Sequence, residues 1–185
     1  KTDARGSIVI GDDMQTSVPG IYAAGDVTDR DQFVYMAAYG AKLAVKNAVL
    51  GEEQRYENAA MPWVVFSDPQ VAGVGLSEQQ ARDAGFDVKT SVVPLDQVPR
   101  ALAARDTRGL IKLVADRATD KLLGGQIIAP EGSDTIQTLV MALKFGMTTK
   151  DLGATIFPYL TTVEGLKLAA QTFDMDVAKL SCCAG

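Results

Sequence analysis

Hydrophobic positions along the chain form short runs with the length of strands and longer stretches with helical spacing. The runs that favour strands are 7–10, 21–24, 63–66, 86–94, 110–114 and 122–128, the last two being a predicted antiparallel pair. Helical spacing favours 33–50, 136–145 and 161–173, and Ser77 with Gln80 has the spacing of a capping box that begins a short helix. Because most strands are clustered before the helices, the pattern predicts an α+β fold rather than a doubly wound one.

These elements fall into three regions. Residues 1–58 read as strand, turn and helix, with the helix stopped by Gly51 and followed by a polar linker over 52–58. Residues 59–172 hold most of the predicted elements, and 173–185 are expected to form a short flexible tail. Because the chain begins at Lys1 with a strand-like segment close behind, we expect it to be the carboxyl-terminal piece of a longer protein.

Composition narrows the classes of function. The 185 residues carry 18 Lys and Arg against 23 Asp and Glu, a net charge of −5, which disfavours nucleic acid and anionic membranes as partners. Histidine is absent, so a histidine general base or a histidine metal ligand within this chain is excluded. No apolar run approaches the length of a membrane span. Low cysteine content without a signal-peptide pattern predicts a cytoplasmic location.

The segment 16–26 offers a site for a cofactor. A predicted buried strand ends in small residues, which are followed directly by Asp26. The carboxylate of Asp26 can accept a hydrogen bond from a sugar hydroxyl. The amino terminus of the following helix can face an electron-rich ring edge with its positive end. The alternative is a plain strand–turn–helix in which Asp26 caps the helix.

The two cysteines, Cys182 and Cys183, are adjacent and close to the last residue. Two cysteines are too few for a four-thiolate zinc site or for a framework of several disulfides. Adjacent thiols on a flexible end offer soft ligands, which soft metal ions prefer over oxygen and nitrogen. The alternative is a disordered end in which two cysteines happen to be neighbours.

Three segments together resemble the pyridine nucleotide–disulfide oxidoreductases. Residues 16–26 resemble the second flavin-binding motif of that family, and 61–69 (MPWVVFSDP) with 71–78 (VAGVGLSE) resemble the opening of its homodimerisation domain. The resemblance implies the end of an FAD-binding α/β domain over 1–58 and an antiparallel-sheet dimerisation domain with helices over 59–172. It also implies a homodimer, with Asp26 and Val34 contacting FAD.

The chain departs from the family at the residue associated with disulfide reduction. Most disulfide reductases of the family carry a His-x-His-Pro-Thr-x-x-Glu segment, in which the second histidine is the acid–base and the glutamate orients it. Tyr159 stands at that histidine here, and Thr161 and Glu164 remain. A phenol with a pKa of about 10 is a poor substitute near neutral pH, so disulfide substrates are disfavoured. For Glu164 we favour a structural role in a capping box with Thr161. Tyr159 could equally be a tyrosine packed in a dimer interface.

The Phe-Pro-Tyr segment and the Ser-Cys-Cys-Ala-Gly end resemble the members of the family that reduce Hg(II) to elemental mercury with NADPH. This resemblance implies that Cys182 and Cys183 acquire Hg(II) and pass it across the dimer interface, and that Tyr159 lines the route. The NADPH site, the Gly-x-Gly-x-x-Gly fingerprint and the inner cysteine pair would lie outside this chain, which we therefore expect to be inactive alone. Two alternatives stay open: a non-catalytic homodimerising module that binds soft metal, and the dimerisation part of an ordinary disulfide reductase.

Overall fold

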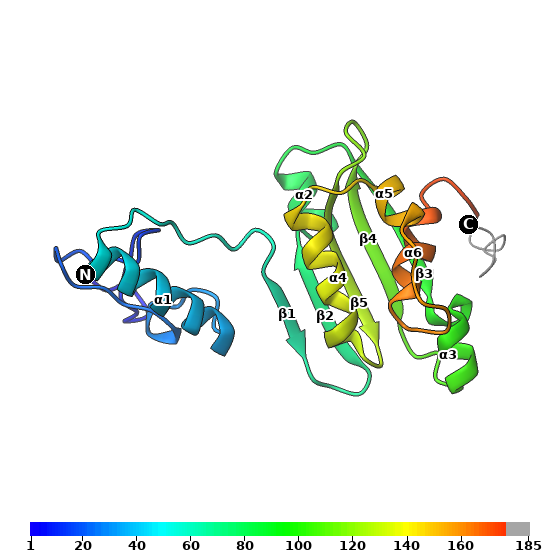
Figure 1. Ribbon diagram of the computed structural model, residues 1–185, viewed down its shortest axis with the longest axis horizontal. Helices are drawn as coiled ribbons and strands as arrows, with labels where there is room; N and C mark the ends of the chain where they lie inside the picture. Colours follow the sequence, from blue (N-terminus) through cyan, green and yellow to red (C-terminus); the bar gives the residue numbers. More distant parts are fainter. Residues whose placement is uncertain (177–185) are drawn as a thin grey trace. The chain divides into compact units, whose positions relative to one another are not determined.

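The computed structural model describes residues 1–176, which divide into two compact units, Lys1–Asn58 and a second unit that begins at Ala59 (Figure 1). Cys182 and Cys183 lie outside the described residues. Within residues 1–176, no helix is long and apolar enough to cross a membrane.

The first unit is built around the helix α1 (Val34–Leu50), preceded by the short 3-10 helix η1 (Asp26–Thr28). As predicted, α1 ends at Gly51, which adopts a φ of 67°. The predicted strands at 7–10 and 21–24 are wrong: the opening segments are joined only by isolated antiparallel bridges, such as Ile10 with Thr16. A strand needs a continuous partner, and these short turns pair with one another at single positions.

The segment after α1, predicted as a linker, packs onto the first unit instead. The Tyr56 side chain is buried, and its hydroxyl donates to the Asp31 carboxylate at 3.1 Å. The Asn47 side chain both donates to the Gln54 carbonyl and accepts from its N–H, each at 2.9 Å. Asn58 donates to the same Asp31 oxygen at 2.7 Å, so side-chain bonds hold this segment to the first unit as far as its last residue.

The second unit is an antiparallel five-stranded sheet with helices, which confirms the predicted α+β class and the predicted antiparallel pair at 110–114 and 122–128. The strand order is β1-β2-β5-β4-β3, with every neighbouring pair antiparallel. The strands are β1 (Pro62–Val65), β2 (Gln70–Gly75), β3 (Val88–Pro94), β4 (Leu110–Asp116) and β5 (Leu122–Ala129). The helices are α2 (Glu78–Asp83), α3 (Pro99–Ala104), α4 (Gly132–Lys144), α5 (Thr149–Ala154) and α6 (Glu164–Gln171), with a 3-10 helix η2 (Leu95–Gln97).

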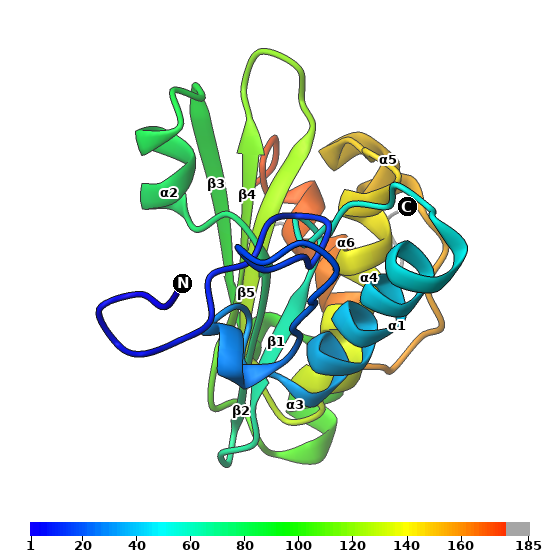
Figure 2. The same ribbon diagram turned by 90° about the vertical axis from the view of Figure 1, so that its left-hand side faces the viewer.

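The main core lies between one face of the sheet and the long helices. Helix α4 packs on β2 and β5, and α6 packs on β3 and β4. Figure 2 shows these helices on one side of the sheet and α2 on the other, where Ala81 meets Val88 and Val114 in a smaller cluster. The predicted capping box at the start of α2 is present in both halves, between Ser77 and Gln80. Alternation of apolar residues along the strands places one side of each strand in the main core.

Candidate functional site

The turn between the opening segments and α1 brings the backbone close to neighbouring atoms at Gly25. This glycine has a φ of 83°, a conformation that side chains with a Cβ rarely adopt. A Cβ atom built there would also lie 3.3 Å from the Cβ of Ala37. The Thr28 hydroxyl donates to the Gly25 carbonyl at 2.7 Å and holds the turn in shape. The local backbone therefore requires the glycine that precedes Asp26.

Asp26 is exposed at the first position of η1, and its carboxylate has no hydrogen bond or ion pair with any residue in 1–176. The capping alternative is not what the structure shows, because Gly25 occupies the cap position and no side chain caps the helix. An exposed acceptor after a small-residue turn suits a hydroxyl-rich ligand. The turn at Gly25 and the carboxylate at Asp26 therefore fit the sugar-like part of a flavin nucleotide.

Val34 is the first residue of α1, and 85% of its surface is exposed. No side chain caps this end of the 17-residue helix, and Phe33 precedes it in an extended conformation. The Phe33 ring stacks on Tyr35, with the ring centroids 5.3 Å apart. The unit therefore presents the positive end of a long helix beside an apolar and aromatic surface.

Tyr159 lies in the turn between α5 and α6 of the second unit, and 62% of its surface is exposed. The Thr161 hydroxyl stabilises this turn, because it donates to the Pro158 carbonyl at 2.9 Å and accepts from the Glu164 N–H at 3.3 Å. Within the described part of this chain, the phenol is thus presented outward rather than packed in the core.

Glu164 forms only half of the predicted capping box. Its N–H reaches Thr161, but its carboxylate turns into the protein, where the residue is 4% exposed. The Oε2 atom is buried without a hydrogen-bond partner among the described residues. A reciprocal capping role for this carboxylate is therefore wrong, because burial in the fold outweighs the local bond back to the turn.

The site residues predicted from the sequence are thus spread along the chain. Asp26 and Val34 belong to the first unit, Tyr159 belongs to the second, and Cys182 and Cys183 lie outside the described residues.

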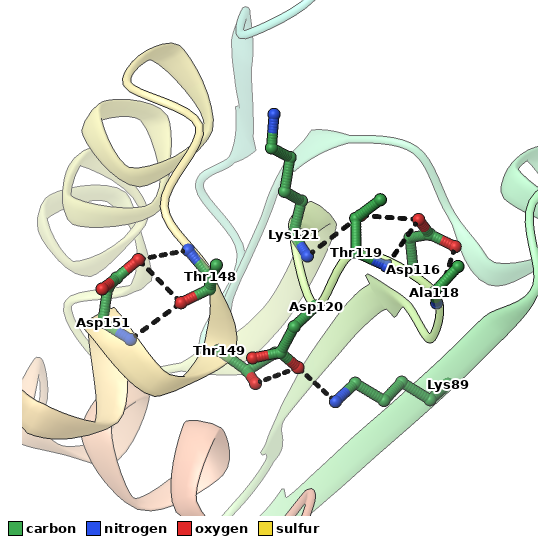
Figure 3. Close-up of polar contacts among 9 residues, drawn as sticks. All are labelled: Lys89, Asp116, Ala118, Thr119, Asp120, Lys121, Thr148, Thr149 and Asp151. Carbon is green, nitrogen blue, oxygen red and sulfur yellow. Dashed lines mark hydrogen bonds and ion pairs between the residues drawn. The ribbon is translucent and has the colours of Figure 1, made fainter.

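A polar cluster that the sequence did not reveal lies at the tip of the β4–β5 hairpin (Figure 3). The Asp120 carboxylate pairs with the Lys89 ammonium and accepts from the Thr149 hydroxyl at 2.7 Å. Burial raises the pKa of Asp120, but Lys89 and Thr149 outweigh it and hold that pKa below its usual range. No local signal could have found this cluster, since Lys89 is 31 residues from Asp120 along the chain.

Two flanking carboxylates in Figure 3 serve local turns. The Thr119 hydroxyl donates to Asp116 at 2.6 Å and lowers the pKa of that carboxyl. Asp151 forms a reciprocal capping box with Thr148 at the start of α5, which lowers the pKa of Asp151. Their spacing could have predicted both turns. Each of these two carboxylates accepts hydrogen bonds from residues close to it in the sequence, which indicates a structural role.

Comparison with family models matches both units. Residues 61–170 match the dimerisation domain of the pyridine nucleotide-disulphide oxidoreductases, and residues 1–54 match the pyridine nucleotide-disulphide oxidoreductase model. The chain belongs to this family. Curated relatives similar to it include the mercuric reductases of Bacillus cereus (54% identical over 98% of this chain) and Streptomyces lividans (48% over 100%). The chain spans only 29% and 39% of these two relatives' lengths.

Solved structures agree with the fold. LpdA from Mycobacterium tuberculosis matches with a TM-score of 0.82 and 26% identity, over 90% of this chain and 36% of that chain. The HOCl-induced flavoprotein disulfide reductase RclA from Escherichia coli, in a Cu(II) complex, matches with a TM-score of 0.83 and 29% identity, over 93% of this chain and 39% of that chain. Members of the family that reduce disulfides therefore share this architecture, so the fold alone does not define the substrate.

Proposed function

We propose that this chain is the carboxyl-terminal part of a cytoplasmic flavoenzyme that reduces Hg(II) to elemental mercury with NADPH. The observation that carries the proposal is the likeness to mercuric reductases along 98–100% of the chain, at 48–54% identity. The balanced reaction is Hg(II) + NADPH → Hg(0) + NADP⁺ + H⁺. The first unit would contribute to FAD binding, the second would form a homodimer, and the last residues would capture the substrate.

Asp26 and Val34 are the residues of the first unit that would hold FAD. The Asp26 carboxylate accepts no hydrogen bond from the part of the chain that the structure describes, and Val34 places an apolar surface at the positive end of α1. FAD, when bound, supplies the transfer of two electrons between NADPH and the substrate. The NADPH site would lie in the part of the enzyme that this chain does not contain.

Cys182 and Cys183 would take up Hg(II) as paired thiolates and pass it on by ligand exchange across the dimer interface. Thiolates are the ligands that soft metal ions prefer, and exchange through an incoming thiolate avoids release of a free ion. Since the metal-bound sulfurs are already deprotonated, the route has no task for a histidine base. Tyr159 would line this route, and its exposure leaves the phenol available to a second chain.

The test is turnover by the full-length enzyme that contains this chain. We expect Hg(II)-dependent oxidation of NADPH under competing thiol, and little turnover of glutathione disulfide or lipoamide. The Cys182→Ala/Cys183→Ala variant is expected to lose most Hg(II) turnover while it keeps bound FAD. Efficient reduction of a disulfide, with no oxidation of NADPH by Hg(II), would support the ordinary disulfide reductase instead. Tight Hg(II) binding without any NADPH oxidation would support the non-catalytic module.

A further inference from the structure

The turn that carries Tyr159 is short, and the second unit holds it at both ends. Phe157, just before the turn, packs against the main core. Thr162, just after it, is buried, and its hydroxyl donates to the Glu131 carboxylate at 3.0 Å. Only residues 158–161, which we call the Tyr159 turn, lie between these two held positions. The backbone of these four residues therefore decides in which direction the exposed phenol is presented.

Leu160, the neighbour of Tyr159, brings backbone strain into this turn. Its φ is 64°, which lies in the left-handed region. A residue with a Cβ atom adopts this region about ten-fold less readily than the right-handed one. Leucine also lacks the short polar side chain with which asparagine or aspartate compensates for that conformation. The strain at Leu160 therefore favours opening of the Tyr159 turn, unless another interaction opposes it.

The Thr161 hydroxyl opposes this strain, because it makes hydrogen bonds to both sides of the turn. It donates to the Pro158 carbonyl at 2.9 Å, which closes the backbone around the two residues between them. It also accepts from the Glu164 N–H at 3.3 Å, which ties the turn to the start of α6. One such bond changes an equilibrium about five-fold, so the two together favour the closed turn about 25-fold. Set against about ten-fold from Leu160, they leave the closed turn in excess over the open turn by about 2.5 to 1.

We propose that Thr161 is a positioning residue for Hg(II) transfer, which holds the Tyr159 turn closed so that the phenol lines the route of the metal. This inference rests on the proposed function. Without the hydroxyl only the strain at Leu160 remains, and the ratio of closed to open turn falls to about 1 to 10. The closed fraction then falls about eight-fold, and a step that needs the closed turn is weakened by the same factor.

The test uses the full-length holoenzyme and Thr161→Val, which keeps the branched shape of the side chain and removes its hydroxyl. Hydrogen exchange at the Glu164 amide is expected to become about three-fold faster, because the open fraction of the turn rises by that factor. We expect kcat/KM for Hg(II) under competing thiol to fall about eight-fold, or as far as it falls in Tyr159→Ala if that loss is smaller. FAD content and the rate at which NADPH reduces FAD are expected to stay at the parent values.

Two variants control for the loss of a hydroxyl. Thr161→Ser keeps the hydroxyl and is expected to keep both the amide exchange and the kcat/KM of the parent. Thr155→Val is the matched control outside the turn. The Thr155 hydroxyl also makes a bond to a backbone carbonyl, that of Asp151 at 2.8 Å, but this bond closes the end of α5. Thr155→Val is therefore expected to leave kcat/KM for Hg(II) unchanged.

A second background separates positioning from a general structural effect. In the Tyr159→Ala enzyme, Thr161→Val is expected to cause no further fall in kcat/KM, because no phenol remains to be positioned. An equal fall in that background, or unchanged exchange at the Glu164 amide, would overturn the positioning role. If Tyr159→Ala itself leaves Hg(II) turnover unchanged, the role that the proposed function gives to Tyr159 fails, and the exchange result alone decides whether Thr161 holds the turn.

Discussion

Gly109, just before β4, is the position where a single added methyl group is most costly. Its φ is 133°, and a Cβ atom built on it would lie 1.8 Å from the carbonyl oxygen of Ile128 on β5. The backbone cost of a left-handed conformation is about 1–2 kcal/mol. The oxygen is backbone and cannot rotate away, so the β4–β5 ladder must shift. Overpacking with a weakened hydrogen bond adds about 2–3 kcal/mol, and Gly109→Ala is expected to destabilise the second unit by about 4 kcal/mol.

Gly85, after α2, is the matched control, because it also has a positive φ, of 86°, but no atom lies within 4 Å of a Cβ built there. Gly85→Ala is expected to cost only the backbone term, about 1 kcal/mol. Urea unfolding followed by circular dichroism measures both, and in a thermal scan the expected shifts are roughly 15 °C for Gly109→Ala and 4 °C for Gly85→Ala. Equal losses in the two variants would refute the argument that the clash with Ile128 dominates.

Three further outcomes are expected. Lys112, at 2.7 Å, and Arg82, at 2.8 Å, lower the pKa of Glu78 from 4.5 to about 2. The stability that this carboxylate contributes is therefore complete above about pH 4.5 and is lost as the pH falls towards 2. Urea unfolding at several pH values is expected to show the gap between the parent and Glu78→Gln closing over that window, and a gap independent of pH would contradict it. Glu164→Met removes a buried carboxylate whose Oε2 has no hydrogen-bond partner within residues 1–176. In urea unfolding this variant is expected to be neutral or to stabilise the protein by up to about 2 kcal/mol, and a loss above about 1 kcal/mol would contradict the expectation. Tyr159→His adds a competing metal ligand and is expected to slow Hg(II) turnover of the full-length enzyme. Tyr159→Phe is the control, because it adds no metal ligand. A histidine variant with the turnover of the parent would contradict the role given to the phenol.

Elements that depend on local sequence were predictable. The helix α1 has an apolar stripe and a glycine after its last residue, and β4 with β5 form a hairpin of neighbouring strands. The capping box at the start of α2 depends only on Ser77 and Gln80, which are three residues apart, and both of its hydrogen bonds form.

Features that depend on the tertiary fold were not predictable. Thr161 and Glu164 have the same spacing as a capping box, and the Glu164 N–H does donate to the Thr161 hydroxyl. The Glu164 side chain, however, is buried in the fold and makes no return bond to the Thr161 backbone. The Lys89–Asp120 pair joins β3 to the tip of a distant hairpin, and neither residue has a local signal for the other. Asp26 was assigned from a motif, and the structure adds that its carboxylate is not used as a helix cap.

Acquisition of Hg(II) by Cys182 and Cys183 is the step on which the proposed function depends. The most direct measurement is a titration of the reduced 185-residue chain with Hg(II) under competing thiol, beside the Cys182→Ala/Cys183→Ala variant. We expect one tightly bound Hg(II) per chain, and we expect this binding to be lost in the double variant. Equal binding by the two proteins would contradict it and would leave a dimerisation domain of a flavoprotein whose substrate is set elsewhere.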